Sequence, residues 1–512
     1  MDVLTRRQAL GGGLALLALA ACGAPASSVT RCDVLVYGGT PAGITAAVTA
    51  AHLGLRSVLV LGESPLGGMV TNGLGHTDLT QPAILGGWTR EFFALVGAAY
   101  GRDEPAYDFA PSVATQVFTR MLADAGVQFV QGTLRHATAS GGRVESVQLD
   151  DGSTYAAPTF VDASYEGDLI GHAGLPYVTG REPSSRYGES VAGFRAATTS
   201  ARWTPASGFP EGFLAAPPTD RTRGSGDDRT MAYNFRLCLT KDLARGTRFV
   251  EPPGYDADAF HAALPLVTGT GPINAVALPG GKYDLNSSHD LMTDVVNASR
   301  PYPTAGSVGA RQAIVARHKA YTQGLLHHLS TDARVPEALR AEVTQYALAA
   351  DEFTDNGNWP AQLYVRASRR LVGRHVLTQE DVSSRADRDD AVAYAAYAID
   401  CHTVQQFRDA DGSVSREGTI VAPDGLKPEY AVPFDVIRPA NTHSNVLAPV
   451  CTSASHVAYC SLRMEPHFML LGEAAGAAAA VAHAHGTGTG NVTADEVRSA
   501  LRSKDSVLST PF

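Results

Sequence analysis

Two short apolar runs near the start of the chain predict buried strands of a parallel sheet. Residues 32–37 and 57–61 are almost wholly apolar, as expected for central strands that are covered on both faces. Between them, residues 44–54 carry small side chains at helical spacing, which predicts a helix. Together these segments have the size of one βαβ unit, about thirty residues.

Later segments follow the same two patterns, with glycines closing two of the expected helices. The predicted elements are helices at 111–126, 311–329 and 466–485, and strands at 127–132, 144–149, 159–161, 429–437 and 445–450.

The distribution of these patterns predicts an α/β fold with a discontinuous domain. At 512 residues the chain is too long for one ordinary core. The middle of the chain is richer in proline, tyrosine and asparagine than either end, so we expect a nucleotide-binding domain with an α+β substrate domain inserted into it. The expected divisions are 32–172 and 396–490 for the nucleotide-binding domain, 173–395 for the insertion and 491–512 for a C-terminal tail.

The first 21 residues indicate a twin-arginine export signal. Arg6 and Arg7 precede an apolar run, 11–21, that is too short to span a membrane stably. The sequence LAAC, ending at Cys22, resembles a lipobox, in which the cysteine is lipidated and becomes the first mature residue. We therefore expect a lipoprotein outside the cytoplasm, anchored through a flexible linker at 22–31. An uncleaved apolar helix is the alternative.

Charge and cysteine content exclude some classes of partner. A formal net charge of −10 argues against nucleic acid, because a phosphate backbone needs a basic face. No cysteine stands in a CxxC pair, so neither a disulfide framework nor a metal site is predicted. Cys451 and Cys460 could pair, and buried free thiols are the alternative. The six cysteines are Cys22, Cys32, Cys238, Cys401, Cys451 and Cys460.

The turn after the first strand has the pattern of a dinucleotide loop. Gly38 would make the tight turn, Thr40 stands where a second glycine usually lets the backbone approach the pyrophosphate, and Gly43 would let the helix pack on the strand. The phosphates would lie on the N–H groups at the helix start. The residues expected at this position are Gly38, Gly39, Thr40, Pro41, Ala42 and Gly43.

An acid at the end of the second strand usually binds the ribose hydroxyls. Leu61 occupies the usual position and cannot do so, whereas Glu63 lies two residues further and would point to the same side of a continuing strand. We expect Glu63 to bind the ribose; a solvated loop glutamate is the alternative.

Four segments together resemble the FAD-dependent oxidoreductase family, in a branch often labelled xanthan lyase-related. They are CDVLVYGGTPAGITAAV at 32–48, LGGMVTNGLGHTDL at 66–79, VDASYEGDLIGHAG at 161–174 and the run SASHVAYCSLRMEP onwards at 453–482. The resemblance implies a fold of the glutathione-reductase class, with a Rossmann-like domain that binds FAD across the sheet.

The resemblance also implies further cofactor contacts. The turn at 66–69 would pass near the flavin, the segment around Leu134 would offer backbone to the adenine, and the motif around Asp162 would bind the ribityl or pyrophosphate region. The last helix would face the flavin with its N-terminus. Ordinary turns, helix caps and a buried structural helix are the alternatives. The residues assigned in this way are Gly67, Gly68, Met69, Leu134, Asp162, Gly167, Asp168, Glu465 and Gly472.

Catalysis would need a base beside the flavin. His402 is the first candidate because histidine titrates near working pH, and Asp400, two residues away, could orient it or act itself. His456 is a second candidate. Arg463 could place positive charge beside the flavin or bind a substrate oxygen; satisfied core groups and a salt bridge with Glu465 or Asp435 are the alternatives.

Export favours FAD over a nicotinamide cofactor, because free NAD is not supplied outside the cytoplasm whereas FAD travels bound. We expect hydride transfer from a small organic substrate, carbohydrate derivatives included, to flavin N5, with oxygen, a quinone or a carrier as electron acceptor. Two other hypotheses are a polysaccharide-binding or lyase-type protein with structural FAD, and an NAD(P)-dependent dehydrogenase.

Overall fold

The structure is a computed structural model, and it describes residues 29–202, 208–269, 271–288, 290–384, 387–421 and 429–509. The expected export signal, Cys22 and most of the expected linker lie outside these residues. Among the described helices, none is long and apolar enough to cross a membrane.

The predicted parallel sheet is present and has five strands in the order β23-β8-β2-β3-β4. All four neighbouring pairs are parallel. Because β2 is the middle strand, the loop that follows it lies at the centre of the carboxyl edge of the sheet. The strands are β2 (Val34–Tyr37), β3 (Ser57–Val60), β4 (Gln128–Val130), β8 (Thr159–Asp162) and β23 (Val446–Leu447).

Both faces of the sheet are buried at β23, β8, β2 and β3, whereas the edge strand β4 is partly exposed. Val34 and Val36 of β2 pack into one core with the helices, whereas Leu35 and Tyr37 pack into a second core. The second core lies between the parallel sheet and a four-stranded sheet of order β1-β7-β6-β5. Its strands are β1 (Val29–Arg31), β5 (Leu134–Ser140), β6 (Arg143–Leu149) and β7 (Thr154–Ala156).

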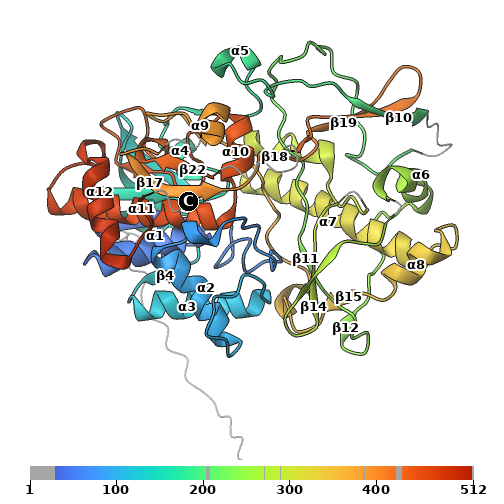
Figure 1. Cartoon of the computed structure of the whole chain (residues 1–512), viewed down its shortest axis with the longest axis horizontal. Helices are drawn as coiled ribbons and strands as arrows, with labels where there is room; N and C mark the ends of the chain where they lie inside the picture. The colour runs from blue at the N-terminus through green and yellow to red at the C-terminus, as the bar shows by residue number, and fades with distance from the viewer. Residues whose placement is uncertain are drawn as a thin grey trace, which may run out of the picture.

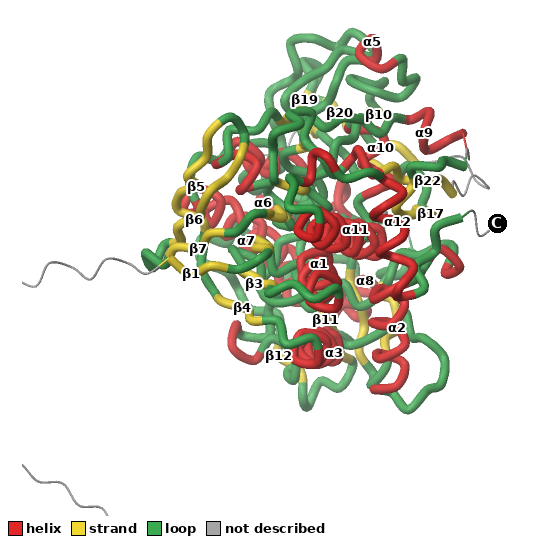
Figure 2. Tube along the Cα trace, turned by 90° about the vertical axis from the view of Figure 1, so that its left-hand side faces the viewer, coloured by secondary structure: helices red, strands yellow, loops and turns green. Residues whose placement is uncertain are grey.

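The helical face is dominated by the packing of α1 (Pro41–His52) against α11 (Glu465–Ala484), which lie side by side in Figure 2. A Cβ on Gly472 would lie 2.2 Å from the carbonyl oxygen of Ala42, and one on Gly476 would lie 2.4 Å from that of Ala46. The Thr45 hydroxyl donates a hydrogen bond to the Met469 carbonyl (2.7 Å). Both contacts advance by four residues in the same direction, so the helices run parallel and their N-termini lie at the same end.

The middle of the chain forms a five-stranded antiparallel sheet of order β12-β15-β11-β14-β13, with α6, α7 and α8 nearby (Figure 1). The elements are β11 (Leu237–Thr240), β12 (Gly246–Thr247), α6 (Ala257–Val267), β13 (Ala275–Leu278), β14 (Lys282–Leu285), α7 (Val308–Thr331), α8 (Glu337–Val343) and β15 (Ala347–Ala349).

Strand pairing crosses the expected division at residues 395 and 396. β10 (Thr198–Arg202) pairs with β20 (Ser413–Glu417), which also pairs with β19 (Gln405–Arg408). β17 (Ala391–Ala396) pairs with β22 (Glu429–Pro433). Segments before and after that division therefore share sheets, and the fold is α/β with a Rossmann-like parallel sheet.

The remaining short elements connect these sheets. They are α2 (Gly87–Ala99), α3 (Pro111–Asp124), α4 (Asp168–His172), β9 (Tyr177–Val178), α5 (Ser184–Tyr187), β16 (Arg370–Leu371), α9 (Gln379–Ser384), β18 (Asp400–Cys401), β21 (Ile420–Val421), α10 (His456–Leu462) and α12 (Ala494–Leu501). The 3₁₀ turns are Pro82–Ile84, Val296–Ser299, Tyr302–Thr304, Thr354–Asn356, Phe434–Val436, Thr489–Asn491 and Arg502–Lys504.

Replacing Gly472 with alanine tests the α1–α11 contact. The added methyl would meet the Ala42 backbone, so we expect Gly472→Ala to lower the free energy of unfolding by about 1–3 kcal/mol. Gly309→Ala is the matched control, because nothing lies within 4 Å of a Cβ at that helical position, and it should be neutral or stabilising by up to about 1 kcal/mol. Urea unfolding of both variants measures the difference; equal effects would contradict the contact.

Candidate active site

The loop after β2 is organised by Thr40, which is fully buried and is the N-cap of α1. Its hydroxyl donates a hydrogen bond to the carbonyl of Ala163 (2.8 Å) and accepts one from the N–H of Gly43 (3.2 Å). The hydroxyl therefore ties the start of the helix to the chain that follows β8. This is why a threonine serves where a second glycine usually stands.

The glycines around Thr40 are required by close backbone contacts. Gly38 has a φ of +117°, and a Cβ there would lie 2.4 Å from the carbonyl carbon of Ala163. A Cβ on Gly43 would lie 2.0 Å from the carbonyl oxygen of Gly38. The first N–H groups of α1 lack acceptors within the helix. Pro41 and Ala42 open the helix, so the loop forms a narrow turn at an anion-binding helix start.

A cavity of about 400 Å³ lies at the carboxyl ends of β2 and β3, and three predicted contacts line it, namely Glu63, Leu134 and Asp168. Arg311, in the first turn of α7, forms ion pairs with Glu63 and Asp168 and donates to Asp168 at 2.7 and 2.9 Å. The two acids are therefore fixed in the cavity wall by one guanidinium.

Glu63 is not the solvated loop glutamate that the sequence left open. Its side chain is 18% exposed and faces Arg311. Burial raises the pKa of Glu63, although Arg311 opposes the shift.

The motif around Asp162 positions Asp168. Asp162 is fully buried; it accepts hydrogen bonds from the Ser164 hydroxyl (2.6 Å) and the Ile170 N–H (2.8 Å), and burial raises its pKa to about 6. Gly167 takes the left-handed conformation before α4, with φ +69°. The Asp162 carboxylate thus supports the turn, while Asp168 reaches the cavity.

The turn formed by Gly67, Gly68 and Met69 joins the loop of β2 to the start of α11. The N–H of Gly67 donates to the carbonyl of Gly39 (2.7 Å). A Cβ on Gly68 would lie 2.5 Å from the Tyr165 hydroxyl oxygen. The Met69 N–H donates to that oxygen (3.0 Å), and the hydroxyl donates to Glu465 Oε1 (2.6 Å).

Glu465 is the first residue of α11, and it is buried. Its second carboxyl oxygen, Oε2, has no hydrogen-bond partner among the described residues. Burial raises the pKa of Glu465 to about 8, so the side chain is mostly neutral at pH 7. Gly472, two turns further along, contacts α1 as described above.

A second cavity, of about 480 Å³, brings together two of the predicted catalytic residues, His402 and Asp400. His402 Nδ1 lies 2.8 Å from Asp294 Oδ2, and His402 Nε2 lies 3.8 Å from Asp400 Oδ2. Burial would raise the pKa of Asp294, but the charges of Arg366 and His402 outweigh it and lower that pKa to about 2. Asp294 is therefore an ionised partner that fixes the orientation of the His402 ring.

Arg463, the residue directly after α10, forms hydrogen bonds with this group of residues. It donates to the Asp400 carboxylate and carbonyl, both at 3.1 Å, and to the Tyr364 hydroxyl at 2.9 Å. Its ion pair is thus with Asp400 rather than with Glu465 or Asp435. Arg366 pairs with Asp294 at 3.0 Å, so two arginines balance the two carboxylates that flank His402.

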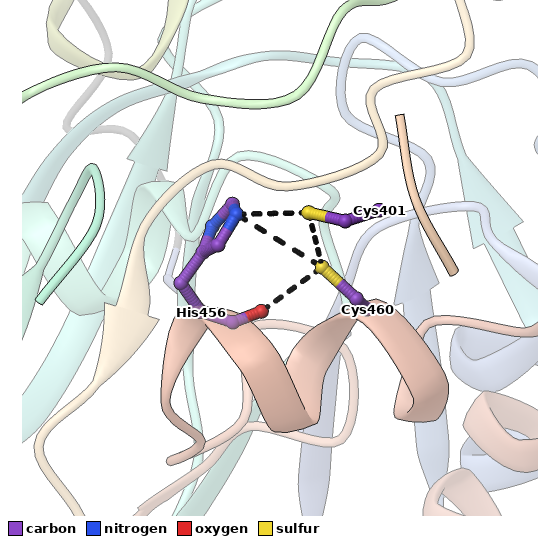
Figure 3. Close-up of side chains that lie close together, drawn as sticks. All are labelled: Cys401, His456 and Cys460. Carbon is purple, nitrogen blue, oxygen red and sulfur yellow. Dashed lines mark hydrogen bonds between the residues drawn. The ribbon is translucent and has the colours of Figure 1, made fainter. Parts of the chain in front are cut away.

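His456, the other candidate base, is not among the residues that line this cavity. It is buried, and its Nε2 lies 3.1 Å from the sulfur of Cys401, which in turn lies 2.8 Å from the sulfur of Cys460 (Figure 3). Cys460 therefore has Cys401 as its sulfur neighbour, not Cys451. All five described cysteines are buried free thiols.

Asp294 and Arg311 line the two cavities, and the sequence did not single them out. Arg311 is the first residue of the predicted helix at 311–329, but nothing in the pattern indicates its acidic partners. Asp294 lies in an irregular segment, and its proximity to His402, which is 108 residues away, comes only from the fold.

The model of the FAD dependent oxidoreductase family matches residues 33–501. The chain belongs to this family. It is therefore an enzyme, an FAD-dependent oxidoreductase, and FAD is its cofactor. In a comparison with curated proteins, no match was found.

Solved structures of FAD-dependent enzymes match part of the chain. The flavin-dependent brominase Bmp2 is 17% identical over 30% of this chain and 42% of its own, with a TM-score of 0.24. The amino acid oxidase NikD is 15% identical over 30% and 57%, with a TM-score of 0.23. Thioredoxin reductase from T. acidophilum is 18% identical over 26% and 35%, with a TM-score of 0.18. The chain thus spans well under two thirds of each relative.

The residues present fit FAD. The turn at Gly38–Gly43 leaves no room for side chains, Glu63 faces a cavity at the ribose position, and Glu465 keeps a buried oxygen without a partner. The loop would hold the phosphates, the cavity at Glu63 and Leu134 would hold the adenosine part, and the start of α11 would lie toward the flavin.

Thr40→Ala tests the loop. The substitution removes a helix cap and leaves the Ala163 carbonyl without its hydroxyl partner, so we expect a loss of about 1–2 kcal/mol in stability. A comparable loss at the phosphate site would weaken FAD binding about tenfold. Absorbance titration of the apoprotein with FAD measures this. Thr40→Ser keeps the hydroxyl and should bind normally; identical affinities for the two variants would contradict the assignment.

Proposed function

We propose that the protein dehydrogenates a small polar substrate, carbohydrate derivatives included, with His402 as the general base. The observation that carries the proposal is the cavity in which His402 stands between Asp294 and Asp400. Bound FAD supplies the acceptor of the hydride that leaves the substrate.

The hydrogen bond to Asp294 assigns the proton of neutral His402. A carboxylate can only accept, so Nδ1 carries the proton and donates it to Asp294. Nε2 is then the basic nitrogen, and the 3.8 Å gap to Asp400 leaves it free to take a proton from a substrate hydroxyl. Asp294 and Asp400 would both stabilise the imidazolium that forms.

The walls of the cavity support a hydroxylated substrate. Hydroxyl and amide groups can each donate or accept a hydrogen bond from a sugar or polyol. Such residues on the cavity wall are Asn286, Ser287, Ser288, Thr403 and Thr419.

His402→Gln tests the base. We expect anaerobic bleaching of the bound flavin by the substrate to slow by about 10²–10⁴-fold, because the proton acceptor is lost. Asp294→Asn should also slow the reaction, since it removes the acceptor that fixes the ring. His443→Gln, at an exposed histidine, is the matched control. Hexoses, hexuronates and polyols are the substrates to screen by stopped-flow absorbance.

Two outcomes would contradict this proposal. Unchanged bleaching in His402→Gln with normal flavin content would remove His402 as the base. Release of unsaturated sugar ends from a polysaccharide, without bleaching, would favour the lyase-type hypothesis instead.

We also propose that the enzyme is exported and lipid-anchored, with a membrane quinone, oxygen or a carrier as electron acceptor. The paired Arg6 and Arg7 and the sequence ending at Cys22 support this. Cys22→Ala should move the protein from the membrane fraction to the soluble fraction of the cell envelope. Replacing both arginines, Arg6→Lys and Arg7→Lys, should retain the protein in the cytoplasm. Cell fractionation measures both; membrane binding of Cys22→Ala equal to that of the unmodified chain would contradict the anchor.

A further inference from the structure

A sulfur cluster lies directly behind the candidate active site. Cys401 belongs to β18, and Cys460 and His456 lie one turn apart on α10. The three side chains place their ligand atoms within 4.8 Å of one another, and all are buried. Figure 3 shows the ring of His456 and both sulfurs pointing toward one another.

The two sulfurs are closer than ordinary non-bonded atoms. Cys401 Sγ and Cys460 Sγ lie 2.8 Å apart, whereas even the smaller carbon atoms make non-bonded contact at about 3.5–4.0 Å. Two thiolates on one zinc ion would lie about 3.7 Å apart, given Zn–S bonds of about 2.3 Å at tetrahedral angles. A closed zinc site also takes four ligands, whereas the histidine, cysteine and acidic side chains grouped here in the described part of the chain provide three; the sulfur of Met231 lies 3.6 Å from that of Cys460. The 2.8 Å separation is longer than the bond of about 2.05 Å in a disulfide, so the two free thiols are close enough to need only a short movement to form one.

The environment makes the two thiols unequal. Burial opposes ionisation of Cys401, but the hydrogen bond from Cys460 and the presence of His456 lower the pKa of its thiol. Burial and the neighbouring Cys401 raise the pKa of Cys460. Nδ1 of His456 has no hydrogen-bond partner in the described part of the chain, so a proton on Nε2 is the one that can be donated to the Cys401 sulfur.

We propose that Cys401 and Cys460 form a reversible redox pair, with Cys401 as the nucleophile and Cys460 as the resolving thiol. Cys401 is buried but is one of the residues that line the 480 Å³ cavity, so a small peroxide in that cavity would lie next to this residue. Its thiolate attacks the peroxide: an S–O bond forms, the O–O bond breaks, and the leaving hydroxide takes a proton to become water. The Cys460 sulfur then attacks the Cys401 sulfur; the S–S bond forms, the S–O bond breaks, and hydroxide leaves with the Cys460 proton as a second water. Two thiols are oxidised by two electrons, and hydrogen peroxide is reduced to two waters.

The position of the pair couples it to the candidate active site. Cys401 lies between Asp400 and His402 in the sequence, and Cys460 is three residues before Arg463, which binds Asp400. A disulfide would join β18, which ends directly before the candidate base, to the helix that leads to Arg463. Oxidation would therefore act on the residues around the base.

Mapping of the cysteines in the full-length holoenzyme tests the pair. The reduced protein is treated with hydrogen peroxide, alkylated in denaturant and digested, and the peptides are measured by mass spectrometry without reduction. We expect one disulfide between Cys401 and Cys460, reversed by dithiothreitol, while Cys238 and Cys451 remain alkylated thiols. Both peptides recovered as alkylated thiols would overturn the proposal.

Variants and metal analysis separate the remaining possibilities. In Cys460→Ser, peroxide should leave a sulfenic acid on Cys401 that dimedone traps, whereas Cys451→Ser, at a buried thiol bonded only to carbonyls, should form the disulfide normally. Stoichiometric zinc in the purified protein that is lost in Cys401→Ser and kept in Cys451→Ser would overturn the redox pair in favour of a metal site. Mapping of the unmodified chain decides the proposal even if a variant does not fold.

Discussion

The backbone contact between α1 and α11 is the constraint on which both ends of the cofactor site depend. The two helices are more than 400 residues apart in the sequence, and Gly472 and Gly476 let them touch at Ala42 and Ala46. Because the helices run parallel, both N-termini point to the same side. The start of α11 lies about six residues beyond that of α1, or about 9 Å at 1.5 Å per residue. The offset between the two helix N-termini suits a long cofactor. Its phosphates would lie at the start of α1 and its ring system toward the start of α11.

The local parts of this design could be predicted from the sequence. Apolar runs and small-residue spacing located the strands of the parallel sheet and both helices within a few residues, because most of their residues are buried and their patterns are strong. The glycine-rich turn could be predicted from the pattern of a dinucleotide loop. Glu63 was singled out because such a loop is usually followed by an acid that binds the ribose. The hydrogen bond that holds Thr40 in place could not be predicted, because its hydroxyl bonds to Ala163, which is 123 residues away.

The parts that could not be predicted are long-range electrostatic pairs. Arg311 holds Glu63 and Asp168, and Asp294 holds His402, yet the partners are between 108 and 248 residues apart in the sequence. Such pairs form where the fold brings two charged side chains together. The spacing of residues along the chain does not indicate which charges will meet. The same limit applies to the sulfur cluster: Cys460 and His456 are visibly one turn apart, but only the pairing of β18 with β21 (Ile420–Val421) places Cys401 between them.

The balance of charge around His402 bears on what the site can do. With His402 neutral, Asp294 and Asp400 are matched by Arg366 and Arg463, so these five side chains together carry no net charge. A proton taken from a substrate makes the cluster positive by one. Although burial would raise the pKa of Asp294, Arg366 and a protonated His402 together lower it, so this carboxylate stays ionised when the imidazole accepts a proton. The arrangement therefore suits a step in which His402 accepts a proton while a hydride leaves the substrate.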